Sequence, residues 1–140
     1  MSFIPVKSDN GAVLPWEYMP AAAATYKAGQ LLTVSGGKVT ALTAASATTP
    51  PYLCMADVTV ATAGDPIPVT RVSRDWIYES ELNAAMSTAA PGVKASVAAD
   101  GVSVASTAGT FELVSVEGTA AGDKVRGRWV DPTATGGGGT

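Results

Sequence analysis

The residue types that most often perform chemistry are scarce in this sequence. It has 140 residues, no histidine and a single cysteine, Cys54. Without histidine, histidine-based triads and histidine general bases are excluded, and a structural zinc site lacks a plausible set of ligands. We expect Cys54 to be a small buried apolar residue, with a reactive thiol as the alternative. We therefore expect no enzymatic activity, no cofactor and no metal.

Two short stretches resemble chemical sites but have simpler explanations. Glu79 and Glu81 stand beside Trp76 and Tyr78, and two carboxylates suffice for a glycosidase. A solvated strand end is the ordinary explanation of that pair. "SGGK" at 35–38 is similar to part of a phosphate loop, but the first glycine and the final Ser or Thr of that motif are missing. We interpret it as a hairpin turn.

A third stretch, "KVRGRWV", alternates basic and apolar residues. Lys124, Arg126 and Arg128 would share one face of a strand, with Val125 and Trp129 on the other. The basic face is a candidate docking stripe for an acidic partner. The alternative is the solvent face of an outer strand.

The first 26 residues have neither a helical nor an alternating period, and Pro5, Pro15 and Pro20 punctuate them. Proline biases the chain toward extended geometry, and four consecutive alanines are too few for an isolated helix. We therefore predict an extended N-terminal arm over 1–26, which wraps either its own domain or a partner. In the second case its candidate contact residues are Phe3, Ile4, Trp16, Tyr18, Met19 and Tyr26.

From residue 27 onward the pattern indicates strands. "LLTVSGGKVTAL" (31–42) predicts a hairpin with Gly36-Gly37 in a type I′ turn. Residues 93–106 predict a second hairpin of the same kind, with Asp100-Gly101 in its turn. Each hairpin is followed by a segment that starts at an aromatic residue, runs through a strand and reaches Ala-Gly-Asp. We predict an all-β fold of two similar units, 27–82 and 92–131, that share one core. Chance similarity among turns is the alternative.

Three further features concern single elements. Ser80 favours the start of a short helix between the units, as its N-cap. Pro66 and Pro68 indicate an edge strand, because proline donates no ladder hydrogen bond. The glycine-rich stretch 132–140 has the composition of a flexible tail.

The composition limits the classes of partner. The net charge is −3 and 15% of residues are charged, whereas nucleic-acid binding favours a clearly basic domain. No apolar stretch reaches the roughly 18–20 residues that span a bilayer, and the N-terminus lacks the pattern of a signal peptide. We expect synthesis in the cytoplasm, with no membrane anchor and no nucleic-acid partner.

Three segments together resemble the capsid decoration (cement) proteins of tailed phages, and the middle one resembles the lambda-type head decoration protein. They are "EYMPAAAATYKAGQLLTVSGGKVTAL", "PYLCMADVTVATAGDPIPVTRVSRDWIYES" and "GDKVRGRWV". The resemblance is best over 17–82 and rests on Leu31-Leu32, Ala56-Asp57, and Trp76 with Tyr78-Glu79. Residues 92–130 are similar to the C-terminal β part of related cement proteins.

The resemblance implies a small β-tulip or barrel-like domain on the outer surface of a phage head. The protein would be made in the host cytoplasm and would bind the major capsid protein through its arm, as part of the virion. Self-association as a trimer is favoured, with dimer or monomer as alternatives because the C-terminal half is longer than in the lambda type. On this interpretation, deleting residues 2–24 leaves the domain folded and abolishes capsid binding.

The main alternative function is a carbohydrate-binding or adhesin-like β module on a virion or cell surface. Tryptophan side chains stack on sugars, and the chain has three: Trp16, Trp76 and Trp129. Nothing in the sequence brings the three together.

Overall fold

The computed structural model describes residues 1–8, 16–42 and 48–130, which form thirteen strands and no helix. The strands are β1 (Ile4–Ser8), β2 (Glu17–Pro20), β3 (Ala24–Tyr26), β4 (Leu31–Ser35), β5 (Lys38–Ala41), β6 (Tyr52–Cys54), β7 (Val58–Val60), β8 (Pro66–Arg71), β9 (Trp76–Glu81), β10 (Lys94–Val97), β11 (Val104–Ala108), β12 (Phe111–Val116) and β13 (Lys124–Trp129). The all-β prediction is confirmed. No helix in this part of the chain is long and apolar enough to cross a membrane.

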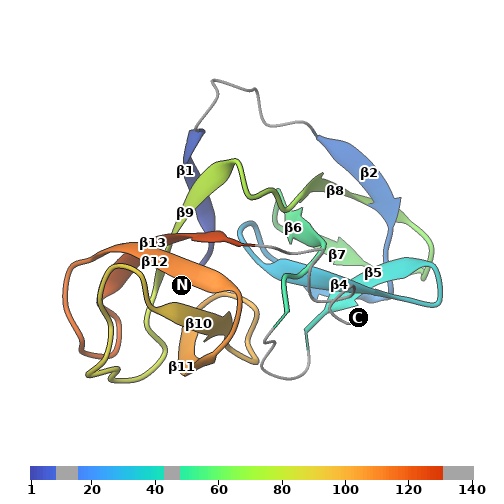
Figure 1. Cartoon of the computed structure of the whole chain (residues 1–140). Helices are drawn as coiled ribbons and strands as arrows, with labels where there is room; N and C mark the ends of the chain where they lie inside the picture. Colours follow the sequence, from blue (N-terminus) through green and yellow to red (C-terminus); the bar gives the residue numbers. More distant parts are fainter. Residues whose placement is uncertain (9–15, 43–47, 131–140) are drawn as a thin grey trace.

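The strands form two large sheets and one small one. Sheet A has the order β1-β9-β13-β12-β10-β11, sheet B has the order β2-β8-β6-β4-β5, and β3 pairs with β7. Neighbouring strands within each sheet are antiparallel. In Figure 1, β10 to β13 lie on the left and β2 to β8 on the right. The described strands close no barrel.

The two large sheets repeat one strand order. Sheet B contains β5-β4-β6-β8-β2, and sheet A contains β11-β10-β12-β13-β9 in the corresponding places. The registers correspond as well: Glu17 pairs with Val69 in sheet B, as Tyr78 pairs with Gly127 in sheet A. We call residues 17–71 unit 1 and residues 76–129 unit 2.

The main-chain hydrogen bonds outside the strands repeat too. In unit 1, Gly29 N donates to Cys54 O at 2.8 Å, and in unit 2, Gly92 N donates to Leu113 O at 2.7 Å. The two glycines have φ values of 86° and 94°, a region that L-residues with a side chain rarely adopt. Each unit therefore needs a glycine at the turn that leads into its hairpin.

The same equivalence holds beside each Ala-Gly-Asp turn. Ala21 N donates to Asp65 O, and Leu82 N donates to Asp123 O, each at 3.0 Å. These bonds place β2 at the start of unit 1 and β9 at the start of unit 2. The units therefore begin earlier than the sequence suggested, and the predicted helix at Ser80 is wrong, because this residue lies in β9 and is buried.

The apolar side chains form two cores, which we call core 1 and core 2. Core 2 comes wholly from unit 1 and contains Ala21, Tyr26, Leu32, Val39, Tyr52, Cys54, Val60, Ile67 and Val69. Core 1 lies mainly within unit 2, but Leu31 and Leu53 of unit 1 also belong to it. Sheet B thus has one face on core 2 and, at its β4 and β6 end, the other face on core 1, which joins the units.

The predicted two-residue turn is present in one hairpin and absent from the other. Gly36 and Gly37 have φ values of 59° and 77°, as a type I′ turn between β4 and β5 requires. Between β10 and β11 the connection is longer, and the Asp100 carboxylate accepts hydrogen bonds from the backbone N–H groups of Val102 and Ser103. The side chain of an Asx residue stabilises this loop.

The edge-strand prediction for Pro66 and Pro68 is wrong. They lie on β8, between β2 and β6. The position tolerates proline because β6 ends at Cys54, before it reaches Pro68. At this point Met55 N donates to Pro68 O at 3.0 Å, so only the acceptor of Pro68 is used.

The described parts of the predicted arm are strands of the domain. β1 pairs with β9, β2 with β8, and β3 with β7. The prediction of extended geometry is correct, but these segments find their hydrogen-bond partners within the same chain. Residues 9–15 of the arm and the predicted tail at 132–140 lie outside the described residues.

Candidate docking surface

Two of the six candidate contact residues of the arm are core residues. Phe3 is 1% exposed and its ring lies 5.5 Å from that of Phe111 and 5.4 Å from that of Trp129, between centroids. Tyr26 is fully buried in core 2, and its hydroxyl donates to Ala22 O at 2.6 Å. These two side chains stabilise the domain, which corrects their assignment as contacts to a partner.

The other four differ in exposure according to strand alternation. Met19 is half-buried and packs against core 2. Ile4, Trp16 and Tyr18 are 49%, 56% and 67% exposed. Ile4 on β1 and Tyr18 on β2 lie on the strand faces that point away from the cores, and Trp16 directly precedes β2. These three residues of the original six are therefore accessible to a partner.

The exposed face around Tyr18 is apolar over two neighbouring strands. Tyr18 pairs with Pro68 and Pro20 pairs with Pro66 across β2 and β8. Trp16 directly precedes β2 and is exposed as well. Because alternate residues of an extended chain share a face, we assign it to this side too. We call these five residues, Trp16, Tyr18, Pro20, Pro66 and Pro68, the apolar face. An exposed group of large apolar residues on a small protein often marks an interaction site.

The corresponding face of unit 2 carries charges. In the register of β9 and β13, Glu79 pairs with Arg126 and Glu81 pairs with Lys124. The Arg126 Nε atom donates to the Glu79 carboxylate at 3.0 Å. These pairs occupy the positions of Tyr18 with Pro68 and Pro20 with Pro66, so the same backbone carries ionic pairs in one unit and apolar pairs in the other.

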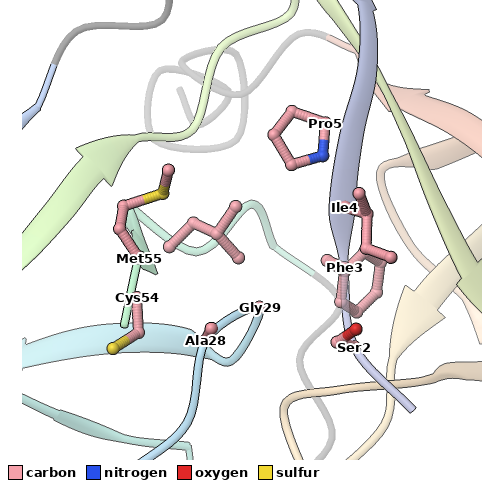
Figure 2. Close-up of a pocket in the computed structure, with 9 residues that line it drawn as sticks. Ser2, Phe3, Ile4, Pro5, Ala28, Gly29, Cys54 and Met55 are labelled. Atoms are coloured by element: carbon pink, nitrogen blue, oxygen red, sulfur yellow. The ribbon is translucent and has the colours of Figure 1, made fainter. Parts of the chain in front are cut away.

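A groove adjoins the apolar face on the side of β6. It has a volume of about 310 Å³ and lies between the start of β1 and the end of β6. Figure 2 shows Phe3, Ile4 and Pro5 on one side of the groove, opposite Met55. Met55 also links the groove to the apolar face, because its N–H donates to Pro68 O.

The predicted basic stripe has the expected geometry but not the expected charge. Lys124 and Arg126 are exposed and Arg128 is half-buried, while Val125 and Trp129 are buried, which confirms the alternation. Each basic residue, however, lies opposite a glutamate of a neighbouring strand: Glu81, Glu79 and Glu112 respectively. The face is therefore of mixed sign, and an acidic partner would meet three carboxylates as well.

Side chains suited to chemistry do not converge in the described part of the chain. It holds no group of three or more His, Cys, Asp or Glu that could bind a metal ion. Cys54 is buried in core 2, as predicted, and burial raises the pKa of its thiol above the ordinary value. The thiolate, which is the nucleophilic form, is therefore disfavoured.

The sequence pointed to Trp16 and Tyr18 but missed Pro20, Pro66, Pro68 and Met55 as parts of one surface. The missing information was the register between β2 and β8, which joins residues about 50 positions apart. The signal was present in the alternation of Pro66 and Pro68, which places both prolines on one face. Comparisons of the chain with models of protein families and with curated proteins find no match.

Proposed function

We propose that this protein is a structural decoration (cement) protein of a tailed-phage head. It binds the outer surface of the shell, contacts the major capsid protein through the apolar face and the adjoining groove, and stabilises the capsid lattice. It is made in the host cytoplasm and becomes part of the virion. It uses no enzymatic step, cofactor, membrane or nucleic acid, and the β-tulip description of its fold belongs to the same proposal.

The observation that carries the proposal is the contrast between equivalent faces of the two units. Tyr18 and Pro68 are exposed or half-buried apolar residues at positions where unit 2 has the Glu79–Arg126 ion pair. Since the fold accepts charges at these positions, folding does not require the apolar pair. Large aromatic side chains dominate the energetics of protein interfaces, so Trp16 and Tyr18 are suited to anchor a partner.

The mechanism is stabilisation by mass action. A protein that binds the assembled shell and not its free subunits lowers the free energy of the shell, by about 2.7 kcal/mol per site at a hundredfold excess over Kd. Many equivalent sites on one shell add their contributions. A rigid β domain with preformed contact residues loses little entropy on binding, which favours this role.

The test is co-sedimentation with phage heads that lack decoration protein. Tyr18→Ser and Ile4→Ser, which alter the apolar face and the groove rim, should each reduce binding, and Glu81→Ser on unit 2 serves as the matched control. Circular dichroism checks that all variants are folded. Equal binding by all three variants, or no binding by the wild type, would refute the proposal.

One observation favours the carbohydrate-binding alternative. Trp16, which directly precedes β2, and Tyr18 on β2 are both exposed and lie two residues apart, a spacing at which two aromatic rings can stack on neighbouring sugars. Trp129 is buried and does not contribute. A glycan array separates the alternatives: specific binding that Trp16→Ser abolishes would favour a carbohydrate ligand over the capsid.

A further inference from the structure

β2 of unit 1 corresponds to β9 of unit 2. The outer edge of β9 is covered by β1, so the outer edge of β2 is the counterpart of a covered edge. β1 pairs with β9 so that Ile4 lies opposite Glu79 and Lys7 lies opposite Ile77. By the register of the two units, Glu79 corresponds to Tyr18 and Ile77 to Trp16. No described residue pairs with this edge of β2 at Trp16 to Tyr18.

The backbone direction at this edge follows from one hydrogen bond. Pro68 O accepts from Met55 N, so the polar backbone groups of Pro68 face β6 and those of Val69 face β2, because they alternate along a strand. Val69 pairs with Glu17. The N–H and C=O of Glu17 therefore face β8, and those of Trp16 and Tyr18 face outward. An edge with free donors and acceptors is a template for another strand.

We propose that this edge pairs with β2 of a second copy of the chain, antiparallel about a two-fold axis at Glu17. Trp16 then lies opposite Tyr18 of the second copy, and the reverse, so that all outward backbone groups of both residues are paired. A register centred on Tyr18 would instead place Trp16 opposite Pro20, which has no N–H. The proline therefore disfavours that register relative to the one centred on Glu17.

The side chains fit this arrangement. The two Trp16–Tyr18 pairs lie on the outer face, where cross-strand aromatic pairs stabilise a sheet. The two Glu17 residues lie opposite each other, but each carboxylate accepts a hydrogen bond from Arg71 Nε at 2.8 Å, which offsets their repulsion. The same patch serves both copies, as an interface with two-fold symmetry requires.

The dimer does not depend on the proposed capsid function. Edge pairing uses the main chain of β2 and leaves the apolar face open, so the dimer presents two apolar faces side by side. A dimer that does not bind shells would refute only the capsid function, and a monomer that binds them would refute only the dimer. The two-fold geometry replaces the trimer that the sequence resemblance favours.

Sedimentation equilibrium of the full chain without capsids tests the proposal. The wild type should show a concentration-dependent monomer–dimer equilibrium. Tyr18→Pro removes two intermolecular N–H donors from the dimer and none from the β2–β8 ladder, so it should weaken association about 30-fold. Tyr18→Thr keeps the donors and should weaken association less. A wild type that stays monomeric up to about 1 mM, or a folded Tyr18→Pro variant that dimerises normally, would overturn the proposal.

Disulfide trapping tests the register. The Glu17 residues form a non-hydrogen-bonded pair, whose Cα atoms lie about 4.5 Å apart in antiparallel sheets, within reach of a disulfide. Glu17→Cys should therefore form a covalent dimer on mild oxidation. Trp16→Cys, whose cysteine lies opposite Tyr18 of the second copy, should not. Equal cross-linking of the two variants, or preference for Trp16→Cys, would contradict the register.

Discussion

The outer faces of the two units have equivalent strand arrangements but carry different side chains. Tyr18 with Pro68 in unit 1 and Glu79 with Arg126 in unit 2 occupy the same places in the same register. The fold itself therefore does not dictate which kind of pair stands there. At the other end of sheet B the outer face is also apolar, but there Leu53 packs into core 1. Only the exposed apolar residues at the β2 and β8 end of sheet B are not explained by packing within the fold.

The two units also differ in how their first strands are covered. β9 of unit 2 has β13 on one side and β1 on the other. β2 of unit 1 pairs with β8 on one side, and on its other side only its far end approaches β5, where Ala21 bridges to Val39. The N-terminal segment thus completes unit 2 and inserts Phe3 into core 1. Its role in the structure is to join the units, since Phe3 N donates to Gly29 O of unit 1 at 2.8 Å.

The largest effect on stability is expected from deletions that distinguish the contribution of β1 from that of β2. Deleting residues 2–8 removes β1 and Phe3 but keeps unit 1 whole, and should cost at least the 3–5 kcal/mol typical of a buried phenylalanine. Deleting residues 2–24 also removes β2 and should leave the chain unfolded. This reverses the expectation from the sequence. Urea denaturation measures both effects. A stably folded 2–24 deletion variant would support the original prediction that these residues form an arm separate from the domain.

The equivalent glycines Gly29 and Gly92 give a matched comparison. A Cβ at Gly92 would meet no atom within 4 Å, whereas one at Gly29 would contact the Ser2 side chain and lie 3.0 Å from Phe3 O. Gly92→Ala should cost about 1–2 kcal/mol for its positive φ. Gly29→Ala should cost a further 1–3 kcal/mol for overpacking. Equal losses in chemical denaturation would mean that the N-terminal segment does not press on this turn.

Buried acidic groups in both cores, among them Cys54 and Tyr26 in core 2 and Tyr78 in core 1, should make stability fall at alkaline pH. The Cys54 thiol should act first, because cysteine has the lower ordinary pKa. Burial raises the pKa of Cys54 in core 2 and of Tyr78 in core 1 above their ordinary values of 9.0 and 10.0. The unfolded chain therefore loses these protons first, and stability falls as pH rises above 9, by up to about 1.4 kcal/mol per pH unit for each group. In the Cys54→Ala variant, the decrease in stability should begin only near pH 10, where tyrosine in the unfolded chain loses its proton. Identical pH profiles for this variant and the wild type would contradict the prediction.

The smallest effect on stability is expected from exchanging the chemistry of the two faces. Tyr18→Glu combined with Pro68→Arg copies the Glu79–Arg126 pair onto unit 1. Exposed ion pairs contribute about 0–1 kcal/mol, so the free energy of unfolding should change by no more than about 1 kcal/mol. Unfolding of this double variant would show that the apolar pair is needed by the fold, and the contrast between the faces would lose its functional meaning.

Local patterns predicted the parts of the fold that depend on neighbouring residues. The Gly36-Gly37 hairpin, the burial of Cys54 and the alternation along β13 all follow from turn chemistry or from the period of a strand. The helix expected at Ser80 failed because a local N-cap preference is weaker than pairing with β13 on one side and β1 on the other.

Partners distant in sequence could not be predicted. The glutamates that lie opposite the basic stripe come from β9 and β12, and the register that builds the apolar face joins β2 to β8. The correspondence between "EYMP" and "YESE" near the starts of the two units was missed because the two segments have the same place in the sheet but no identical residue at any aligned position. It became visible only through the repeated hydrogen bonds.

Hydrogen exchange of the protein, free and bound to undecorated heads, tests most directly whether the apolar face of unit 1 is the docking surface. We predict that binding protects the amides of 16–19, Ile67 and Val69 beyond any protection in the free dimer, and leaves those in 79–81 and 124–126 unchanged. Protection confined to the charged face of unit 2, with the amides of unit 1 unchanged, would contradict the assignment.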